Sequence, residues 1–370
     1  MYRIPENHAR SSLLEKMHLD PWLLALLLTL AAMGLFVLYS ASNSHLAVVE
    51  QQALRLALGF GVMFLFAQIP PHLLRHWSTS IFILCLILLF AVLIFGQTSQ
   101  GARRWLNLMI FRFQPSEIMK LALPLLLCHY LSHYRLPPPK KVIAIAALTL
   151  LIPVLLTAKQ PDLGTAILIA TAGIFVILLA GIPWKLLAGT AIASVMSTPI
   201  LWHLLHQYQR DRILVLLSPE RDPQGKGYHI IQSKIALGSG GLWGKGYLAG
   251  TQAHLQFLPA HTTDFIFAVA GEEFGLLGSI AILLLFAAIL YRCLLICVRA
   301  QDHFTRLLSG SLSLTFFVSA LINVGMVIGV LPVVGVPLPL ISYGGSSLLT
   351  VMAAFGMIMS IHTHRKLISS

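Results

Sequence analysis

The chain has 370 residues, of which 57% are hydrophobic and only 10% are charged. A soluble domain needs far more polar surface, so this composition indicates an integral membrane protein and excludes a soluble globular class. The formal charge of +12 includes no Lys- and Arg-rich run with interleaved aromatic residues, so no nucleic-acid partner is expected.

Apolar segments recur along the chain, each close to the length of about 20 residues that crosses a bilayer as a helix. They lie at about 21–41, 51–69, 78–96, 115–133, 142–158, 163–181, 186–204, 265–291, 307–330 and 346–361. No cleavage site follows the first, so we expect it to span the membrane rather than to be removed. The segments predict an all-α integral membrane protein, a bundle of about ten transmembrane helices in a single domain over 1–370.

Basic residues are unevenly divided between the two sides of this predicted bundle. Ten spans put both termini on one side, and most basic residues of the short loops, such as Arg75 and Arg306, fall there. By the positive-inside rule that side is cytoplasmic. The tails 1–20 and 362–370 are then cytoplasmic, and the connection 206–263 between spans seven and eight is extracytoplasmic. This connection is too long for an ordinary loop, which indicates a function or structure of its own.

Asp264 stands at the start of the eighth predicted span, within QFLPAHTTDFIFAVAGEEFG (Gln256 to Gly275). Only 13 residues of the chain are acidic. A carboxylate at the edge of a membrane helix is costly to bury, so its presence there indicates a functional site. The alternative is a helix N-cap, since Thr262, Thr263 and Asp264 are all capping residue types.

A second polar stretch is GARRWLNLMIFRFQPSEIMK, residues 101–120. Arg104 and Arg112 precede Pro115, a residue suited to start a helix, and Glu117 and Lys120 follow on one helical face. An interfacial amphipathic helix with aromatic anchors and a local Glu–Lys pair is the alternative. It leaves Lys120 unexplained, because an unpaired ammonium inside a span costs about 3 kcal/mol.

Three further stretches carry polar or irregular sequence. Asp162 in KQPDLGT starts the sixth span, either as an N-cap or as a site residue. Arg210 lies in YQRDR of the long connection, before the Gly-rich GKGYHIIQSKIALGSGGLWGKG, where no GK[ST] sequence supports a P-loop. The three prolines of PVVGVPLPLISYGGSS exclude a regular helix before the last span.

Outer-side carboxylates beside outer-side cations suit an anionic substrate held in the membrane. A diphosphate leaving group needs positive charge, and a hydroxyl nucleophile needs a carboxylate base. A transporter would use the same residue types, so composition leaves catalysis and transport both open.

The stretches GARRW, FQPSEIMK, QPDLGT, GYHIIQSKIALGSGGLWGKG, FLPAHTTDFIFAVAGEEFG and GVLPVVGVPLPLISYGGSS follow in this order. Together they resemble the SEDS family (shape, elongation, division, sporulation) from about Asp20 to Lys366. The short tails and the IHTHRK ending favour its elongation branch over its division branch.

The resemblance implies a peptidoglycan glycosyltransferase of the bacterial cytoplasmic (inner) membrane that polymerises lipid II. Its implied partners are a class B penicillin-binding protein and other elongation-complex proteins. By motif position, Asp264 matches the family's essential acid, and we assign it as the base on the acceptor hydroxyl. The motif positions of Arg104, Glu117, Lys120 and Asp162 match polar positions lining the family's central cavity. Arg210, an outer-side cation, is added to them as a substrate-binding residue on the ground of its charge. No cofactor is firmly implied, although Glu117 and Asp162 could hold a divalent cation.

The chain departs from the family pattern at two positions near Asp264. Ala260 stands where the family usually has Glu, and Thr262 where it has His. Any contribution of those two side chains to tuning the base is absent here. The competing functions are a lipid II flippase and a non-catalytic scaffold. A flippase requires polar residues that continue to the cytoplasmic side, whereas the charges within the predicted spans lie toward the outer half.

Overall fold

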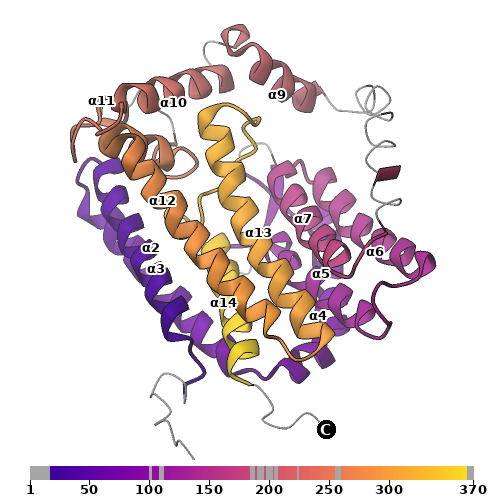
Figure 1. Ribbon diagram of the computed structural model, residues 1–370. Helices are drawn as coiled ribbons and strands as arrows, with labels where there is room; N and C mark the ends of the chain where they lie inside the picture. Colours follow the sequence, from indigo (N-terminus) through magenta and orange to yellow (C-terminus); the bar gives the residue numbers. More distant parts are fainter. Residues whose placement is uncertain are drawn as a thin grey trace, which may run out of the picture.

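The computed structural model describes residues 17–99, 102–107, 112–183, 188–189, 196, 203, 207–222, 225–254 and 260–364. Most of them form helices that stand side by side (Figure 1). The long helices are α2 (Pro21–Ala41), α3 (Leu46–Gln68), α4 (Pro71–Phe95), α5 (Pro115–Leu131), α6 (Lys140–Lys159), α7 (Leu163–Leu179), α12 (Ile266–Val298), α13 (His303–Ile328) and α14 (Ser346–Thr363). The prediction of a mainly helical chain is confirmed.

Seven helices of the described chain are long and apolar enough to cross a bilayer, and α7 is apolar but shorter. The predicted count of about ten is not confirmed. The span at 186–204 lies mostly outside the described residues, and α5, with 17 residues, is not among these apolar helices. The helices are apolar on both faces: Leu23 and Leu27 of α2 are fully buried, whereas Trp22 is 71% exposed. Apolar outer faces are typical of a multi-pass membrane protein.

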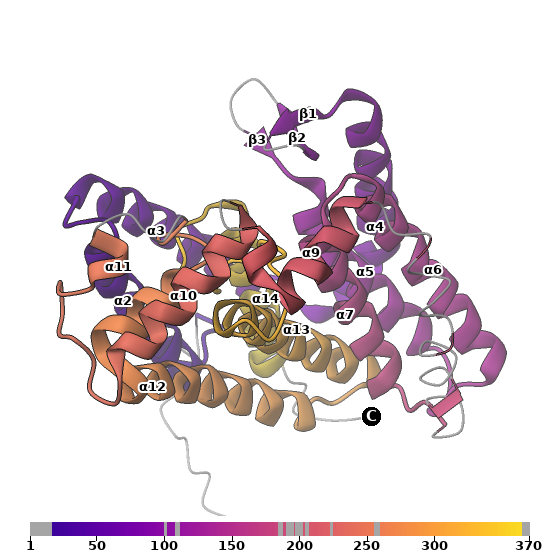
Figure 2. The ribbon, with the colours of Figure 1, turned by 90° about the horizontal axis from the view of Figure 1, so that it is seen from above.

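Two helices occupy the centre of the bundle. Viewed from above, α13 and α14 lie between a group formed by α2, α3 and α12 and a group formed by α4 to α7 (Figure 2). Small residues permit close packing at these contacts. Ser311 of α13 donates to the Ala172 carbonyl of α7 at 2.7 Å, and a side chain on Gly356 of α14 would collide with the Met63 carbonyl of α3.

The two ends of the described chain meet at one end of the bundle, which we call the terminus end. The rings of His18 and His364 stack there with centroids 4.0 Å apart. Asp20 is fully buried, caps α2 by accepting from the Leu23 amide, and pairs with Arg292 of α12 at 2.5 Å. This pairing satisfies a charge that burial would otherwise penalise.

The opposite end, the loop end, is covered by the long connection predicted at 206–263. Its described part is largely helical, with α9 (Gln207–Leu217), the 3-10 turn η1 (Pro219–Arg221), α10 (Lys226–Gly240) and α11 (Thr251–His254). These elements lie across the top of the bundle in Figure 1. Ser233 of α10 donates to the Val327 carbonyl of α13 at 2.9 Å, so α10 is docked on the bundle.

A small antiparallel sheet corrects the all-α prediction. It contains β1 (Gln97–Ser99), β2 (Ala102–Asn107) and β3 (Arg112–Phe113) in that order. Gln97 pairs with Trp105, and Leu106 pairs with Phe113. The alternative of an interfacial helix is therefore wrong for the described residues before Pro115, which pair between strands, and the helix begins only at Pro115.

Helix α12 is broken at Gly275, where φ is 66°, a value that glycine adopts at little cost. Residues 241–246 supply hydrogen-bond partners to the backbone groups freed by the break. The bonds run from the Leu276 and Leu277 amides to the Gly241 and Leu242 carbonyls, and from the Lys245 and Gly246 amides to the Glu272 and Glu273 carbonyls. The predicted continuous span 265–291 is thus two helical pieces joined to the connection.

The carboxylate of Glu272 also holds the long connection against the bundle. It is fully buried and accepts from the Lys245 ammonium at 2.6 Å, from the Thr251 amide at 2.9 Å and from the Gln252 amide at 3.2 Å. Such a buried charge is stable only because these donors satisfy it.

Candidate active site

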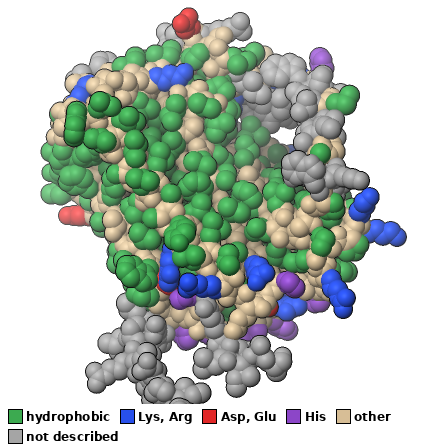
Figure 3. Space-filling model, in the orientation of Figure 1, with side chains coloured by type: hydrophobic (Ala, Val, Ile, Leu, Met, Phe, Trp, Pro, Cys, Tyr) green, Lys and Arg blue, Asp and Glu red, His purple; other side chains and the backbone are tan. Residues whose placement is uncertain are grey.

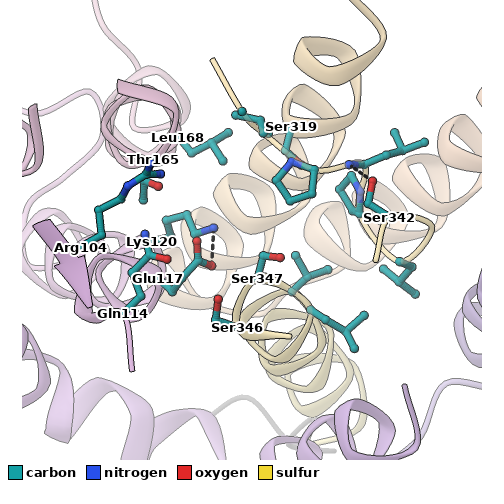
Figure 4. Close-up of a pocket in the computed structure, with 18 residues that line it drawn as sticks. Arg104, Gln114, Glu117, Lys120, Thr165, Leu168, Ser319, Ser342, Ser346 and Ser347 are labelled. Carbon is teal, nitrogen blue, oxygen red and sulfur yellow. Dashed lines mark hydrogen bonds and ion pairs between the residues drawn. The ribbon is translucent and has the colours of Figure 1, made fainter. Parts of the chain in front are cut away.

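A cavity of about 150 Å³ lies at the loop end, between β2, α5, α7, α13, α14 and the irregular segment 335–342. In Figure 4, charged side chains from β2 and α5 lie on one side of it and face serines on the other. The labelled lining residues are Arg104, Gln114, Glu117, Lys120, Thr165, Leu168, Ser319, Ser342, Ser346 and Ser347. The cavity therefore has a charged side, which includes two cations and the Glu117 carboxylate, and a hydroxyl-bearing side.

Glu117 and Lys120 occupy the first two turns of α5, which begins at Pro115. Their i, i+3 spacing puts them on one face. Lys120 Nζ lies 2.7 Å from Glu117 Oε2, and the two side chains are only 10% and 9% exposed. The pairing explains how Lys120 is tolerated within an apolar helix. Its ammonium still lines the cavity.

Asp162 joins three elements beside the cavity. It caps α7 by accepting from the Thr165 amide at 3.3 Å, which confirms the N-cap prediction. The same carboxylate accepts from Gln114 Nε2 at 2.9 Å and lies 3.7 Å from Arg104 Nη1. Asp162 is buried, so it neutralises part of the Arg104 charge and holds two lining side chains in place.

Asp264 lies in the turn before α12. The N-cap of α12 is Phe265 and makes no side-chain capping bond, so the alternative that Asp264 caps this helix is wrong. Its Oδ2 lies 3.7 Å from the point that a Cβ on Gly335 would occupy, and Gly335 lines the cavity. Asp264 is half-buried and is not itself among the described lining residues, so it stands behind the wall at Gly335.

Hydrogen bonds attach the Asp264 turn to the irregular segment 335–342. Asn323 of α13 donates to the carbonyls of Asp264 and Val336 at 2.9 and 2.8 Å. Ser342 donates to the Thr263 carbonyl at 2.6 Å. The turn and the cavity wall therefore hold each other in position through backbone carbonyls, whatever side chains occupy the turn.

The electrostatic setting of Asp264 suits proton transfer. Burial raises the pKa of this carboxyl above its ordinary value, and the positive charge of Arg104 opposes part of that rise. A raised pKa makes a carboxylate a stronger base, and catalytic bases work best when their pKa approaches the operating pH. Arg104 thus lines the charged side of the cavity and also lowers the pKa of Asp264.

The structure brings Arg104, Glu117 and Lys120 to one cavity, with Asp162 and Asp264 against its walls. Arg210 is not among the described lining residues; it lies on α9 and donates to the His203 carbonyl at 2.6 Å. The side chain of Arg112 lies outside the described residues, as do residues 255–259. Ala260 adopts a φ of 52° in the turn before Asp264.

Sequence reasoning missed three polar residues of the site: Gln114, Ser319 and Asn323. Gln114 stood in the motif FQPSEIMK, but its bond to Asp162 spans 48 positions. Asn323 and Ser319 are polar residues within an apolar helix, a signal that indicates function in membrane segments. That signal is weaker for uncharged side chains, because a neutral amide or hydroxyl costs less to bury than a charge.

The two carboxylates suggested for a divalent cation are already engaged with cations, Glu117 with Lys120 and Asp162 with Arg104. Within the part of the chain that the structure describes, no three His, Cys, Asp or Glu side chains gather as metal ligands. The donor set therefore does not fit a cation held by Glu117 and Asp162.

Known proteins are similar to this chain in sequence and in fold. The family model FtsW/RodA/SpoVE, described as a cell cycle protein, matches residues 21–367. The chain belongs to the FtsW/RodA/SpoVE family. This confirms the resemblance inferred from the motifs.

Individual members of the FtsW/RodA/SpoVE family are similar over almost the full chain. The peptidoglycan glycosyltransferase MrdB of Escherichia coli K12 is 50% identical over 98% of this chain and 99% of its own. MrdB of Helicobacter pylori J99 is 36% identical over 89% of this chain and 86% of its own.

Solved structures show the same fold. One, from a study of polymerisation and crosslinking by a peptidoglycan synthase complex, has a TM-score of 0.82 at 30% identity, covering 94% of this chain and 99% of that one. Rod shape determining protein RodA of Thermus thermophilus has a TM-score of 0.71 at 28% identity, covering 94% of this chain and 98% of that one.

Proposed function

We propose that this chain is a peptidoglycan glycosyltransferase that polymerises lipid II into glycan strands during cell elongation. The observation that carries the proposal is the Asp264 carboxylate, half-buried against the wall of a cavity whose other side presents Arg104 and Lys120. Relatives at 50% and 36% identity are named for this activity.

The proposed reaction needs a base and a cationic site. Asp264 takes the proton from the acceptor's GlcNAc 4-hydroxyl while that oxygen attacks C1 of the donor MurNAc. The bond from C1 to the diphosphate breaks, and undecaprenyl diphosphate leaves with the bonding electron pair. Arg104 and Lys120 stabilise the charge that develops on the diphosphate. Glu117 and Asp162 orient these cations.

The same proposal gives the chain a membrane location, an orientation and partners. The chain is a single transmembrane domain of the bacterial cytoplasmic membrane, with the loop end and its cavity facing outward and both termini in the cytoplasm. Its partners are a class B penicillin-binding protein and other elongation-complex proteins. A structural neighbour from work on a peptidoglycan synthase complex supports such an assembly.

The test is polymerisation of lipid II by the purified protein in vesicles with its penicillin-binding partner. We expect Asp264→Asn to lower the rate by at least about 100-fold, the contribution of a general base. Asp211→Asn, an exposed acid on α9, is the control and should polymerise normally. Wild-type polymer from Asp264→Asn would remove this residue from the chemistry.

Transport of lipid II is the alternative, and the names of the relatives do not favour it. Transbilayer movement of labelled lipid II without polymer would reverse this ranking.

A further inference from the structure

A second cavity, of about 230 Å³, lies at the terminus end. It is lined by Arg75 near the start of α4, by Ser132 just after α5, and by five residues from the turn before α13 and its first turn: Gln301, Asp302, His303, Phe304 and Arg306. We call it the basic cavity. It lies at the opposite end of the bundle from the candidate active site and shares no lining residue with it.

Two guanidinium groups line the basic cavity without an acidic partner. Within the described residues, no carboxylate lies within ion-pair distance of Arg75 or Arg306. Asp302 is on the lining, but its carboxylate caps α13 and accepts from the Thr305 amide at 3.0 Å. Asp20, the other described acid of this end, pairs with Arg292. The Asp302 carboxylate keeps its negative charge, but the two arginines outnumber it, so the described lining carries a net positive charge.

The basic cavity lies at the depth of lipid headgroups. The first turns of α4 present Leu73 and Trp77 outward, 40% and 57% exposed, and Trp is typical of the membrane interface. Figure 3 shows Lys, Arg and His side chains gathered along the lower rim, below the broad hydrophobic face. Arg75 occupies the same helical turns as Leu73 and Trp77.

We infer that the basic cavity binds a phosphate group, and that the headgroup of an anionic phospholipid supplies it. Guanidinium groups bind phosphate oxygens in pairs of parallel hydrogen bonds. Basic pockets between transmembrane helices at the cytoplasmic side are typical sites for anionic headgroups. The volume far exceeds the roughly 10–15 Å³ that a single water requires, so a phosphate fits. A soluble phosphate offers the same chemistry, but the interfacial depth favours the lipid.

The test measures how strongly the full-length protein in phosphatidylcholine vesicles holds spin-labelled phosphatidylglycerol relative to spin-labelled phosphatidylcholine. Removing both charges in Arg75→Gln/Arg306→Gln should weaken this preference about 30-fold, since each basic group near the surface contributes about fivefold. Arg299→Gln/Lys141→Gln removes the same charge from exposed residues of this end outside the cavity and should change it little.

The results distinguish a phospholipid site from unspecific attraction and from a site for soluble phosphate. Loss of the preference for phosphatidylglycerol in Arg75→Gln/Arg306→Gln alone supports a phospholipid site. Equal loss in both double variants would mean unspecific attraction to the basic rim and would overturn the inference. Full displacement of the labelled lipid by millimolar inorganic phosphate, dependent on the two arginines, would overturn the lipid source in favour of a soluble phosphate. Both double variants must elute as the wild type does on gel filtration, so that unfolding is not mistaken for lost binding.

Discussion

The side-chain amide of Asn323 lies 2.9 Å from the backbone carbonyl of Asp264 and donates a hydrogen bond to it. Asn323 is fully buried in α13 and also donates to the Val336 carbonyl in the cavity wall. One side chain thus links the proposed base, the wall beside it and a central helix. The position of Asp264 depends on a residue 59 positions away in the sequence.

Replacing Asn323 by leucine should lower the polymerisation rate by about tenfold or more. Both carbonyls lose their donor, and displacements near 1 Å at a reacting group can cost up to about 100-fold. The measurement is the initial rate at saturating lipid II, with the thermal midpoint recorded in parallel. Ser313→Ala is the matched control, because Ser313 is buried in the same helix but donates within it, to the Ser309 carbonyl, and does not line the cavity. Equal rates for both variants would contradict the positioning role.

The pH dependence of the rate should respond to Arg104. Its charge opposes the rise that burial causes in the pKa of Asp264. Asp264 accepts a proton only when ionised, so the rate should fall as the pH drops through this pKa. In Arg104→Gln the pKa rises further, and the acidic limb of the pH–rate profile moves to higher pH. Arg104→Lys keeps the charge and should move it less. An unshifted limb in Arg104→Gln would refute this coupling.

The raised pKa of Asp264 also has a consequence for stability. The folded chain binds this proton more tightly than the unfolded chain, so the contribution of Asp264 to stability is greatest at acid pH and is lost as the pH rises through the folded pKa.

Variants of the Glu117–Lys120 pair should affect the stability and the polymerisation rate differently. Lys120→Met leaves the buried Glu117 carboxylate unpaired, which should cost about 3 kcal/mol in the free energy of unfolding. Glu117→Gln/Lys120→Met removes both charges and should restore most of that stability. If Lys120 stabilises the leaving diphosphate, the double variant stays slow. Thermal midpoints and polymerisation rates measured on the same preparations decide this, and a double variant as fast as the wild type would make the pair purely structural.

Glu272 should control the attachment of the connection at the loop end. Glu272→Gln loses the charge that binds Lys245 and weakens the bonds to the Thr251 and Gln252 amides. Losing hydrogen bonds to a buried charged group should cost about 2 kcal/mol. Amide hydrogen exchange in residues 241–252 should then be about 30-fold faster. Glu220→Gln, an exposed acid of η1, is the control. Unchanged exchange in 241–252 would show that the backbone bonds alone hold the segment.

The amino-acid sequence predicted the helices well in segments where apolar residues dominate. The apolar runs of α2, α6 and α13 were placed within a few residues, since burial in lipid requires only length and hydrophobicity. The cap at Asp162 also followed from local chemistry. The sheet of β1, β2 and β3 was missed because strand pairing depends on partners rather than on the apolar or polar character of ARRWLN.

Sequence by itself determined that this protein lies in the membrane, which family it belongs to, and which scarce charges merit study. A charge within an apolar chain is costly wherever the chain folds, so residues such as Lys120 and Asp264 stand out from the amino-acid sequence alone. Only the tertiary structure decided which of these charges meet. It paired Lys120 with Glu117, placed Asp264 against the glycine of the cavity wall, left Arg210 elsewhere and added Asn323. Those distances depend on how distant helices pack, and local patterns contain no information about that packing.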